Sequence, residues 1–124
     1  MAGELTLSSL KKTWFIDLDG TVLIHNDNVN EKDDKVIQKS IEFLKTIETD
    51  YIVFTTSRKI KHKKKTEQFL KDNKIKYDKV IYNLPYGERI VINDNKTSGL
   101  ITAYALPLNR NDGIEVNLHI DKNK

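Results

Sequence analysis

One stretch decides the fold: Trp14-Phe15-Ile16-Asp17-Leu18-Asp19-Gly20-Thr21. Its first three residues are apolar, and a short aromatic and β-branched run is typical of a buried strand. The two aspartates that follow lie on the same side if the strand continues. Gly20 then allows a sharp turn with backbone angles that other residues avoid. Carboxylates at the end of a buried strand repel each other and are costly to desolvate, so the stretch predicts a hard divalent cation such as Mg²⁺ beside them.

This stretch resembles the first motif of the haloacid dehalogenase (HAD) superfamily, which is Asp-x-Asp-Gly-Thr after an apolar strand. The resemblance implies a phosphatase in which Asp17 is the nucleophile and Asp19 is the general acid and base. It also implies that Asp17 and the backbone carbonyl of Asp19 bind Mg²⁺, and that Gly20 and Thr21 contact the substrate. An acidic turn that caps a strand and binds nothing is the alternative interpretation of the same residues.

The composition is that of one small domain. The chain has 124 residues, of which 38% are hydrophobic, and we expect a catalytic domain over 12–120 with an N-terminal extension (1–11) and a short tail (121–124). It has no cysteine, which excludes disulfides and thiolate zinc sites. No signal peptide or long apolar run is visible, so we expect a cytoplasmic protein without a membrane partner. The net charge of +3 favours anionic small molecules but does not indicate nucleic acid.

Apolar strands alternate with helices along the rest of the chain. Helical spacing of apolar residues predicts helices at 33–48 and 60–73, and Val22 to His25 with the turn residues after it predicts a small flap. Further strands are expected at 51–54, 79–82, 89–92, 101–106 and 116–120. This order favours an α/β fold: a Rossmann-like three-layer sandwich with a central, mostly parallel sheet covered on both faces.

The second predicted strand ends in Thr55-Thr56-Ser57-Arg58, at the edge of the sheet where ligands bind in such folds. It resembles the second HAD motif, and the Thr-x-Arg pattern implies that Thr56 binds the phosphoryl group, with Ser57 and Arg58 beside the substrate. The alternative is that these polar residues only end a strand and cap the next helix.

The segment Ile90-Val91-Ile92-Asn93-Asp94 resembles the fourth HAD motif, in which acidic residues after a strand hold Mg²⁺. The resemblance implies Asp94 as a metal ligand and leaves Asn93 to offer an uncharged amide oxygen. The lysine of the third motif is less clear, because Leu84-Pro85 stands where related phosphatases often have Lys-Pro. Lys79 and Lys96 are nearest the expected regions, and Arg58 and Arg89 are alternatives; each is otherwise an ordinary surface charge. His25, in the predicted flap, is either a substrate contact or a surface histidine.

The gap between Asp19 and Thr56 is too short to hold a cap domain, and so is the gap between Thr56 and Asn93. The chain therefore resembles capless HAD phosphatases, whose open site admits a large substrate or is closed by a neighbouring subunit in a homo-oligomer. Residues 87–96 with Ser98-Gly99-Leu100 resemble small HAD proteins of bacterial capsule and surface-sugar pathways. That implies a small phosphorylated substrate such as a sugar or polyol phosphate.

Three alternatives remain open. The chain is a catalytically silent HAD-like regulatory or assembly subunit, a phosphatase for a nucleic-acid or protein phosphate, or a phosphotransferase. The basic stretch 58–65 is either a solvated helix start, a surface that steers anionic substrates, or a nucleic-acid contact. It contains no aromatic platform for bases, which argues against nucleic acid.

Overall fold

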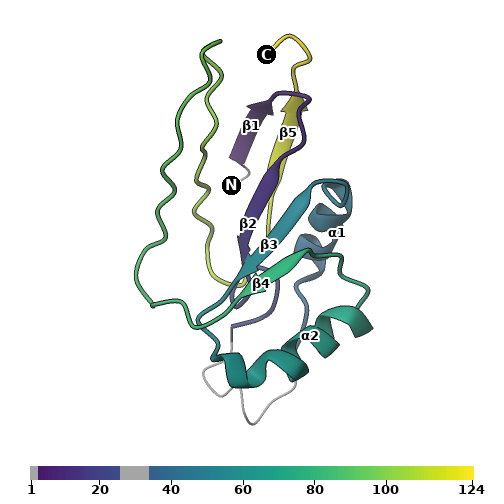
Figure 1. Ribbon diagram of the computed structural model, residues 1–124. Coiled ribbons are helices and arrows are strands. Elements are labelled where there is room, and N and C mark those ends of the chain that lie inside the picture. Colours follow the sequence, from purple (N-terminus) through teal and green to yellow (C-terminus); the bar gives the residue numbers. More distant parts are fainter. Residues whose placement is uncertain (1–2, 26–33) are drawn as a thin grey trace.

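Three parallel strands form the central sheet in the order β2 (Thr13–Asp17), β3 (Tyr51–Thr55) and β4 (Lys79–Ile81), as Figure 1 shows. The computed structural model describes residues 3–25 and 34–124. The register pairs Asp17 with Thr55, so the carboxyl ends of β2 and β3 meet at one edge of the sheet.

Two helices cover one face of this sheet. Helix α1 (Gln38–Thr46) connects β2 to β3, and the 3₁₀ turn η1 (Ile60–His62) with helix α2 (Lys63–Asp72) connects β3 to β4. Both helices contribute to a single core cluster, which includes Ile16, Ile52, Phe54, Phe43 and Leu70. Among the described residues no helix covers the opposite face, where Phe15 and Tyr51 are exposed, so the second helical layer of the expected three-layer sandwich is not present there.

A second sheet consists of β1 (Gly3–Leu7) and β5 (Val116–Ile120), which pair in parallel. The segment expected to be a loose N-terminal extension therefore contains a strand. Its partner β5 lies against the main core through Val116 and Leu118, and Ile114 is buried in that core. The half-exposed strand expected at 116–120 is confirmed, and its alternation reflects this one-sided packing.

The α/β class, the parallel strands and the absence of a cap domain in the described chain are confirmed. The strands near 51–54 and 79–82 and the helix near 60–73 also agree with the structure. The helix expected at 33–48 begins only at Gln38, because Val36 bridges to Leu23 and Ile37 has extended backbone angles of φ −95° and ψ 108°. The flap is only partly visible, since residues 26–28 lie outside the described part. None of the described helices has the length and apolar character needed to cross a bilayer.

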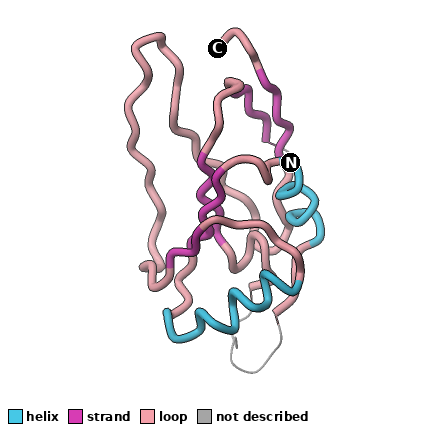
Figure 2. The backbone as a smooth tube through the Cα atoms, turned by 45° about the vertical axis from the view of Figure 1, so that its right-hand side comes forward, coloured by secondary structure: helices cyan, strands magenta, loops and turns pink. Residues whose placement is uncertain are grey.

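The strands expected at 89–92 and 101–106 were predicted wrongly. Both belong to a long extended segment, residues 86–108, which we call the arm. Figures 1 and 2 show the arm outside both sheets, although Arg89 contacts Asp17 and the Leu106 side chain lies 3.6 Å from a Cβ built on Gly3 of β1. Its backbone hydrogen bonds within the described chain are confined to the tip, where the N–H of Lys96 donates to Leu100 and that of Gly99 donates to Lys96. A strand-like sequence forms a strand only beside a partner, and no strand of the described chain pairs with the arm.

Candidate active site

The loop after β2 turns sharply and brings both aspartates to the edge of the sheet. Gly20 has φ of +94°, and its N–H donates to the carbonyl of Leu23 at 2.7 Å. The N–H groups of Thr21, Val22 and Leu23 all donate to the carbonyl of Leu18. This turn explains why a glycine follows the second aspartate, because other residues are strained at positive φ.

Asp17 is partly exposed and lies in contact with the arm. Nη1 of Arg89 lies 2.7 Å from its Oδ1, and Oγ1 of Thr21 donates to its Oδ2 at 3.3 Å. The same guanidinium reaches Oγ1 of Thr55 at 3.4 Å and Oγ of Ser57 at 3.3 Å. One cation and one hydroxyl group therefore contact a carboxylate that solvent can reach, and two further hydroxyl groups contact that cation.

Asp19 points the other way, into the protein. Oγ1 of Thr56 donates to its Oδ2 at 3.2 Å, and Nε and Nη2 of Arg58 donate to it at 3.0 and 2.7 Å. Arg58 also binds Asp34, with Nη2–Oδ1 and Nη1–Oδ2 distances of 2.7 and 3.1 Å, and Oγ1 of Thr66 at 3.1 Å. Burial alone would lower the pKa of Arg58, but its hydrogen bonds to Asp34 and Asp19 and their charges outweigh burial and raise that pKa. Arg58 is therefore a permanent cation between two carboxylates.

The structure places the other candidate cations away from Asp17. Lys79 begins β4, pairs with Val53 and is exposed, and Lys96 is exposed at the tip of the arm. Arg89, which sequence reasoning named only as an alternative, takes the place beside Asp17. No sequence pattern distinguishes Arg89 from the other arginines and lysines, because its contact with Asp17 depends on the path of the arm.

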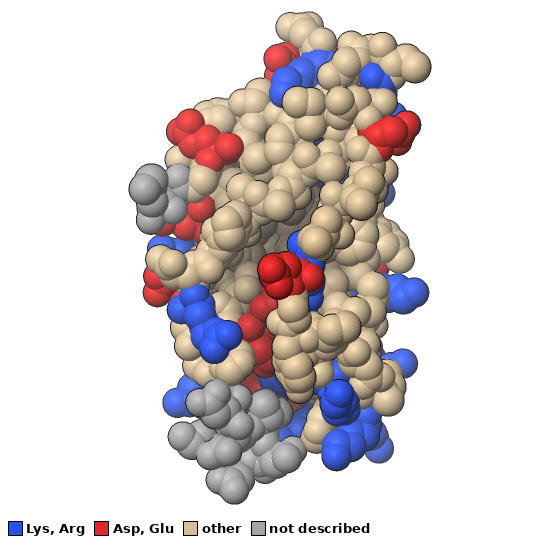
Figure 3. Space-filling view, turned by 90° about the vertical axis from the view of Figure 1, so that its left-hand side faces the viewer, with Lys and Arg blue, Asp and Glu red and all other residues tan. Residues whose placement is uncertain are grey.

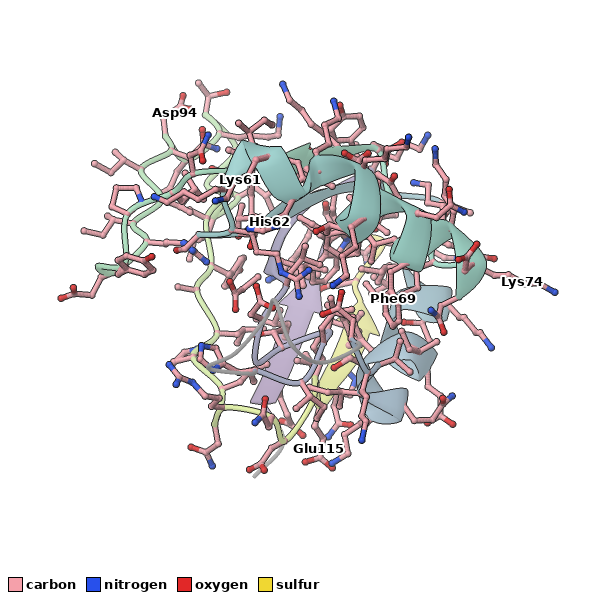
Figure 4. All side chains as sticks on the ribbon, turned by 90° about the horizontal axis from the view of Figure 1, so that it is seen from below. Lys61, His62, Phe69, Lys74, Asp94 and Glu115 are labelled. Carbon is pink, nitrogen blue, oxygen red and sulfur yellow. The ribbon has the colours of Figure 1, made fainter. Side chains whose placement is uncertain are left out.

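The candidate metal ligands are split between two places. Asn93 and Asp94 lie in the arm, where Nδ2 of Asn93 donates to Oγ1 of Thr102 at 2.8 Å and that hydroxyl donates to the carbonyl of Asp94. Figure 4 shows Asp94 at the outer edge of the molecule. Across residues 3–25 and 34–124 no group of three or more histidine, cysteine or acidic residues could hold a metal.

The donor set at the sheet edge nevertheless fits Mg²⁺ in part. Mg²⁺ prefers oxygen ligands, keeps several waters and is often bound by one or two carboxylates together with substrate phosphate. Asp17 and Asp19 supply two carboxylates, although each is paired with an arginine in this structure. These two carboxylates are therefore suitable ligands for Mg²⁺ when the substrate adds its own oxygens.

His25 lies close to the turn. A Cβ placed on Gly20 would be 3.7 Å from the Cβ of His25, and the His25 N–H donates to Oδ1 of Asn111 at 2.7 Å. Sequence reasoning missed Asn111, which bonds Gly20 and His25 of the loop after β2, and Asp34, which binds Arg58. Neither residue belongs to a recognisable motif.

A comparison with protein families agrees with this geometry. The family model for haloacid dehalogenase-like hydrolases matches residues 14–107. The chain belongs to this family. No curated protein and no solved structure matches it.

The residues that the HAD-like hydrolase model matches run from β2 through most of the arm and leave out β1 and β5. They include every candidate of this site named so far except Asn111. A groove of about 700 Å³ lies elsewhere, between β5 and α1, and none of the candidate residues lines it. The candidate site at the carboxyl edge of the central sheet therefore lies within the residues that the family model matches.

Proposed function

We propose that this HAD-like hydrolase is a Mg²⁺-dependent phosphomonoesterase that forms a phosphoryl-enzyme on Asp17. One observation carries the proposal: Asp17 is a solvent-accessible carboxylate at the end of β2 with Arg89 at 2.7 Å and the Thr21 hydroxyl group at 3.3 Å. A carboxylate of this kind can act as a nucleophile, and the neighbouring donors suit the oxygens of a phosphoryl group.

The chemistry assigns a separate task to each aspartate. An oxygen of Asp17 attacks the phosphorus, the bond from phosphorus to the leaving oxygen breaks, and Asp19 gives that oxygen a proton. Water then attacks the aspartyl-phosphate, Asp19 accepts its proton, and inorganic phosphate leaves with Asp17 restored. Before its first task Asp19 must leave Arg58, take up a proton from water and turn towards the leaving group. Asp34 holds Arg58 in place meanwhile.

Mg²⁺ would be held by Asp17 and the backbone carbonyl of Asp19, with Asp94 as a further candidate ligand. It would neutralise negative charge on the phosphoryl oxygens, which is the usual contribution of this ion to phosphoryl transfer. Arg89 supplies positive charge at the same carboxylate from this chain's own residues.

We further propose a small sugar or polyol phosphate as substrate, of the kind used in surface-polysaccharide synthesis. The support is the likeness of residues 87–100 to small HAD proteins of those pathways. Exposed Lys61, Lys63, Lys64 and Lys65 near the amino end of α2 provide positive charge that attracts anionic metabolites.

A second candidate function is a silent HAD-like subunit that regulates or assembles a partner enzyme. The observation that favours it is the pairing of both aspartates with arginines while Asp94 lies apart. In this alternative the charges of the site are neutralised within the chain and no turnover occurs.

Phosphate release separates the two candidates. The wild type, Asp17→Asn and the control Asp72→Asn, which alters an exposed acid at the end of α2, are assayed on phosphorylated sugars, polyols and nucleotides. Release that requires Mg²⁺, stops with EDTA, is lost in Asp17→Asn and is kept in Asp72→Asn supports the phosphatase. If none of the three proteins releases phosphate from any compound, the result contradicts the phosphatase proposal and favours the silent subunit. Inhibition by oligonucleotides at moderate salt would instead favour a nucleic-acid phosphate as substrate.

A further inference from the structure

All three arginines of the chain meet at one loop, the loop that follows β2. Only three of the 21 lysine and arginine residues are arginines. Arg58 and Arg89 contact the two aspartates of this loop. Arg110 lies against its glycine, since Cγ and Cδ of Arg110 are 3.1 and 3.8 Å from a Cβ built on Gly20. The rest of the positive charge is lysine, so arginine is concentrated at the candidate site.

Arg110 differs from the other two arginines because its charge has no partner within the described chain. Arg58 is buried between two carboxylates, and Arg89 is paired with Asp17. Arg110 is exposed, and its guanidinium forms no hydrogen bond or ion pair with a described residue. A planar guanidinium binds a carboxylate or a phosphate through two parallel hydrogen bonds. Arg110 is therefore available to an anion from solution.

Asn111 fixes the backbone beside Arg110 to the same loop. Its N–H donates to the carbonyl of Gly20 at 2.7 Å, and its Oδ1 accepts the N–H of His25 at 2.7 Å. Asn111 has φ of +67°, a conformation that asparagine tolerates better than most residues. These two hydrogen bonds hold the neighbouring arginine at the loop.

A second link runs through the buried side chain of Ser40. The N–H of Ile114 donates to Oγ of Ser40 at 2.9 Å, and that hydroxyl donates to the carbonyl of Thr21. The segment that carries Arg110 is thus attached to the loop at more than one point. A cation whose backbone is held in advance loses less freedom when it binds an anion.

Arg110 lies on the side of the loop that faces away from the phosphoryl acceptor. It contacts Gly20, which directly follows Asp19, and Asp19 protonates the leaving group in the proposed function. Arg89 lies instead at Asp17, which receives the phosphoryl group. Figure 3 views this face and shows acidic side chains along its middle with basic side chains to both sides of them. An anion at Arg110 therefore belongs to the part of the substrate that leaves.

We propose that Arg110 binds a second anionic group of the substrate, a carboxylate or a second phosphate on the leaving part. This inference rests on the proposed function and narrows its substrate to a sugar or polyol phosphate that carries a further acidic group. The residues that the family model matches end at 107, so Arg110 lies outside them. Such a residue suits the choice of substrate rather than the chemistry of the shared site.

Three compounds that differ only at C1 test the proposal. Glucitol 6-phosphate has no second anionic group, gluconate 6-phosphate has a carboxylate at C1, and glucitol 1,6-bisphosphate has a phosphate there. Initial rates of phosphate release give kcat/KM for the wild type, Arg110→Gln and the control Lys71→Gln. The control also removes one exposed positive charge, but in the last turn of α2.

We expect the wild type and Lys71→Gln to prefer one of the doubly anionic compounds over glucitol 6-phosphate by about 10–100-fold in kcat/KM, as for a hydrogen-bonded charged group. The preferred compound identifies the second group as a carboxylate or a phosphate. Arg110→Gln should lose the preference, and because this preference is a ratio within one protein, it does not depend on the fraction of folded protein. Phosphate release without a preference in the wild type, or with the preference kept in Arg110→Gln, overturns the inference and leaves the phosphatase proposal intact.

Binding separates this inference from turnover. Asp17→Asn lacks the nucleophile, so calorimetric titration with the three compounds and Mg²⁺ measures Kd without phosphate release. We expect the same order of affinities, and its loss in Asp17→Asn/Arg110→Gln. If the affinities follow this pattern while the wild type releases no phosphate, the anion site at Arg110 stands and the phosphatase proposal fails. Equal affinities for the three compounds, or no binding of any of them, overturns the inference.

Discussion

Nη2 of Arg58 lies 2.7 Å from Oδ1 of Asp34, and the two side chains are only 5% and 7% exposed. The same nitrogen lies 2.7 Å from Oδ1 of Asp19. Asp34 comes just before α1 and Asp19 follows β2, so one buried guanidinium from the loop after β3 joins both ends of the connection between β2 and α1. The position of Asp19 therefore depends on a residue that has no part in the chemistry itself.

Removing this guanidinium should destabilise the fold. Arg58→Ala leaves the Asp34 and Asp19 carboxylates without their partner, and breaking a buried pair in this way costs about 3–5 kcal/mol. Arg89→Ala is the matched control, because the Arg89–Asp17 pair is 38% and 35% exposed. Its loss should change the free energy of unfolding by about 1 kcal/mol or less. Urea unfolding measures both, and equal losses would contradict the assignment of Arg58 as a structural cation.

The tasks of Asp19 can be separated by the choice of leaving group. Asp19→Asn should lower kcat/KM on alkyl phosphates by about 10²–10⁴-fold, because the leaving alkoxide then receives no proton. The loss on p-nitrophenyl phosphate should be much smaller, since p-nitrophenolate leaves without one. kcat/KM reports the steps up to departure of the leaving group, so a slower second step does not obscure the comparison. Similar losses on both substrates would exclude Asp19 as the general acid.

Much of the central fold could be predicted from the sequence, because local patterns determine it. Apolar runs mark β2 and β3, helical spacing marks α2, and the carboxyl ends of parallel strands bring Asp17, Asp19 and Thr56 to one edge. The arm could not be predicted, since Ile90-Val91-Ile92 has a strand-forming sequence whether or not a partner strand is present. The same limit applies to Arg89 and Asp34, whose contacts depend on how the arm and the start of α1 are placed.

Replacing glycine by alanine should destabilise the fold where the turn needs a positive φ, and should have little effect where the added Cβ meets no other atom. Gly20 has φ of +94°, and a Cβ there would lie 3.1 Å from Cγ of Arg110. Gly20→Ala should therefore cost about 1–2 kcal/mol. Gly87→Ala is the control, because no atom lies within 4 Å of its added Cβ. It should be neutral or slightly stabilising. Thermal unfolding measures both changes, and a neutral Gly20→Ala would refute the strained turn.

The stability of the fold should fall at alkaline pH through two phenols that share one carboxylate. Tyr77 and Tyr82 donate to the two oxygens of Glu67 at 2.9 and 3.0 Å. Burial, with help from Glu67, raises the pKa of Tyr77 from 10.0 to about 12 and also raises that of Tyr82. Because these pKa values are higher in the folded chain, the stabilisation is complete below pH 10 and is lost as pH rises towards 12.

Absorbance of tyrosinate during an alkaline titration measures this effect. In Glu67→Gln the carboxylate charge is gone, so Tyr77 and Tyr82 should ionise at lower pH than in the wild type. If the titration curves of the wild type and Glu67→Gln coincide, Glu67 does not hold the two phenols.

The parallel pairing of β1 with β5 has a consequence for the order in which parts of the molecule fold and unfold. The two strands come from opposite ends of the described chain, so they can meet only after nearly all of the segment between them is available. Contacts of such long sequence separation are made late in folding, because loop closure costs entropy before the contact is gained. Backbone amides of β1 should accordingly exchange with solvent faster than those of the buried strand β3, which makes the small sheet a separate opening unit.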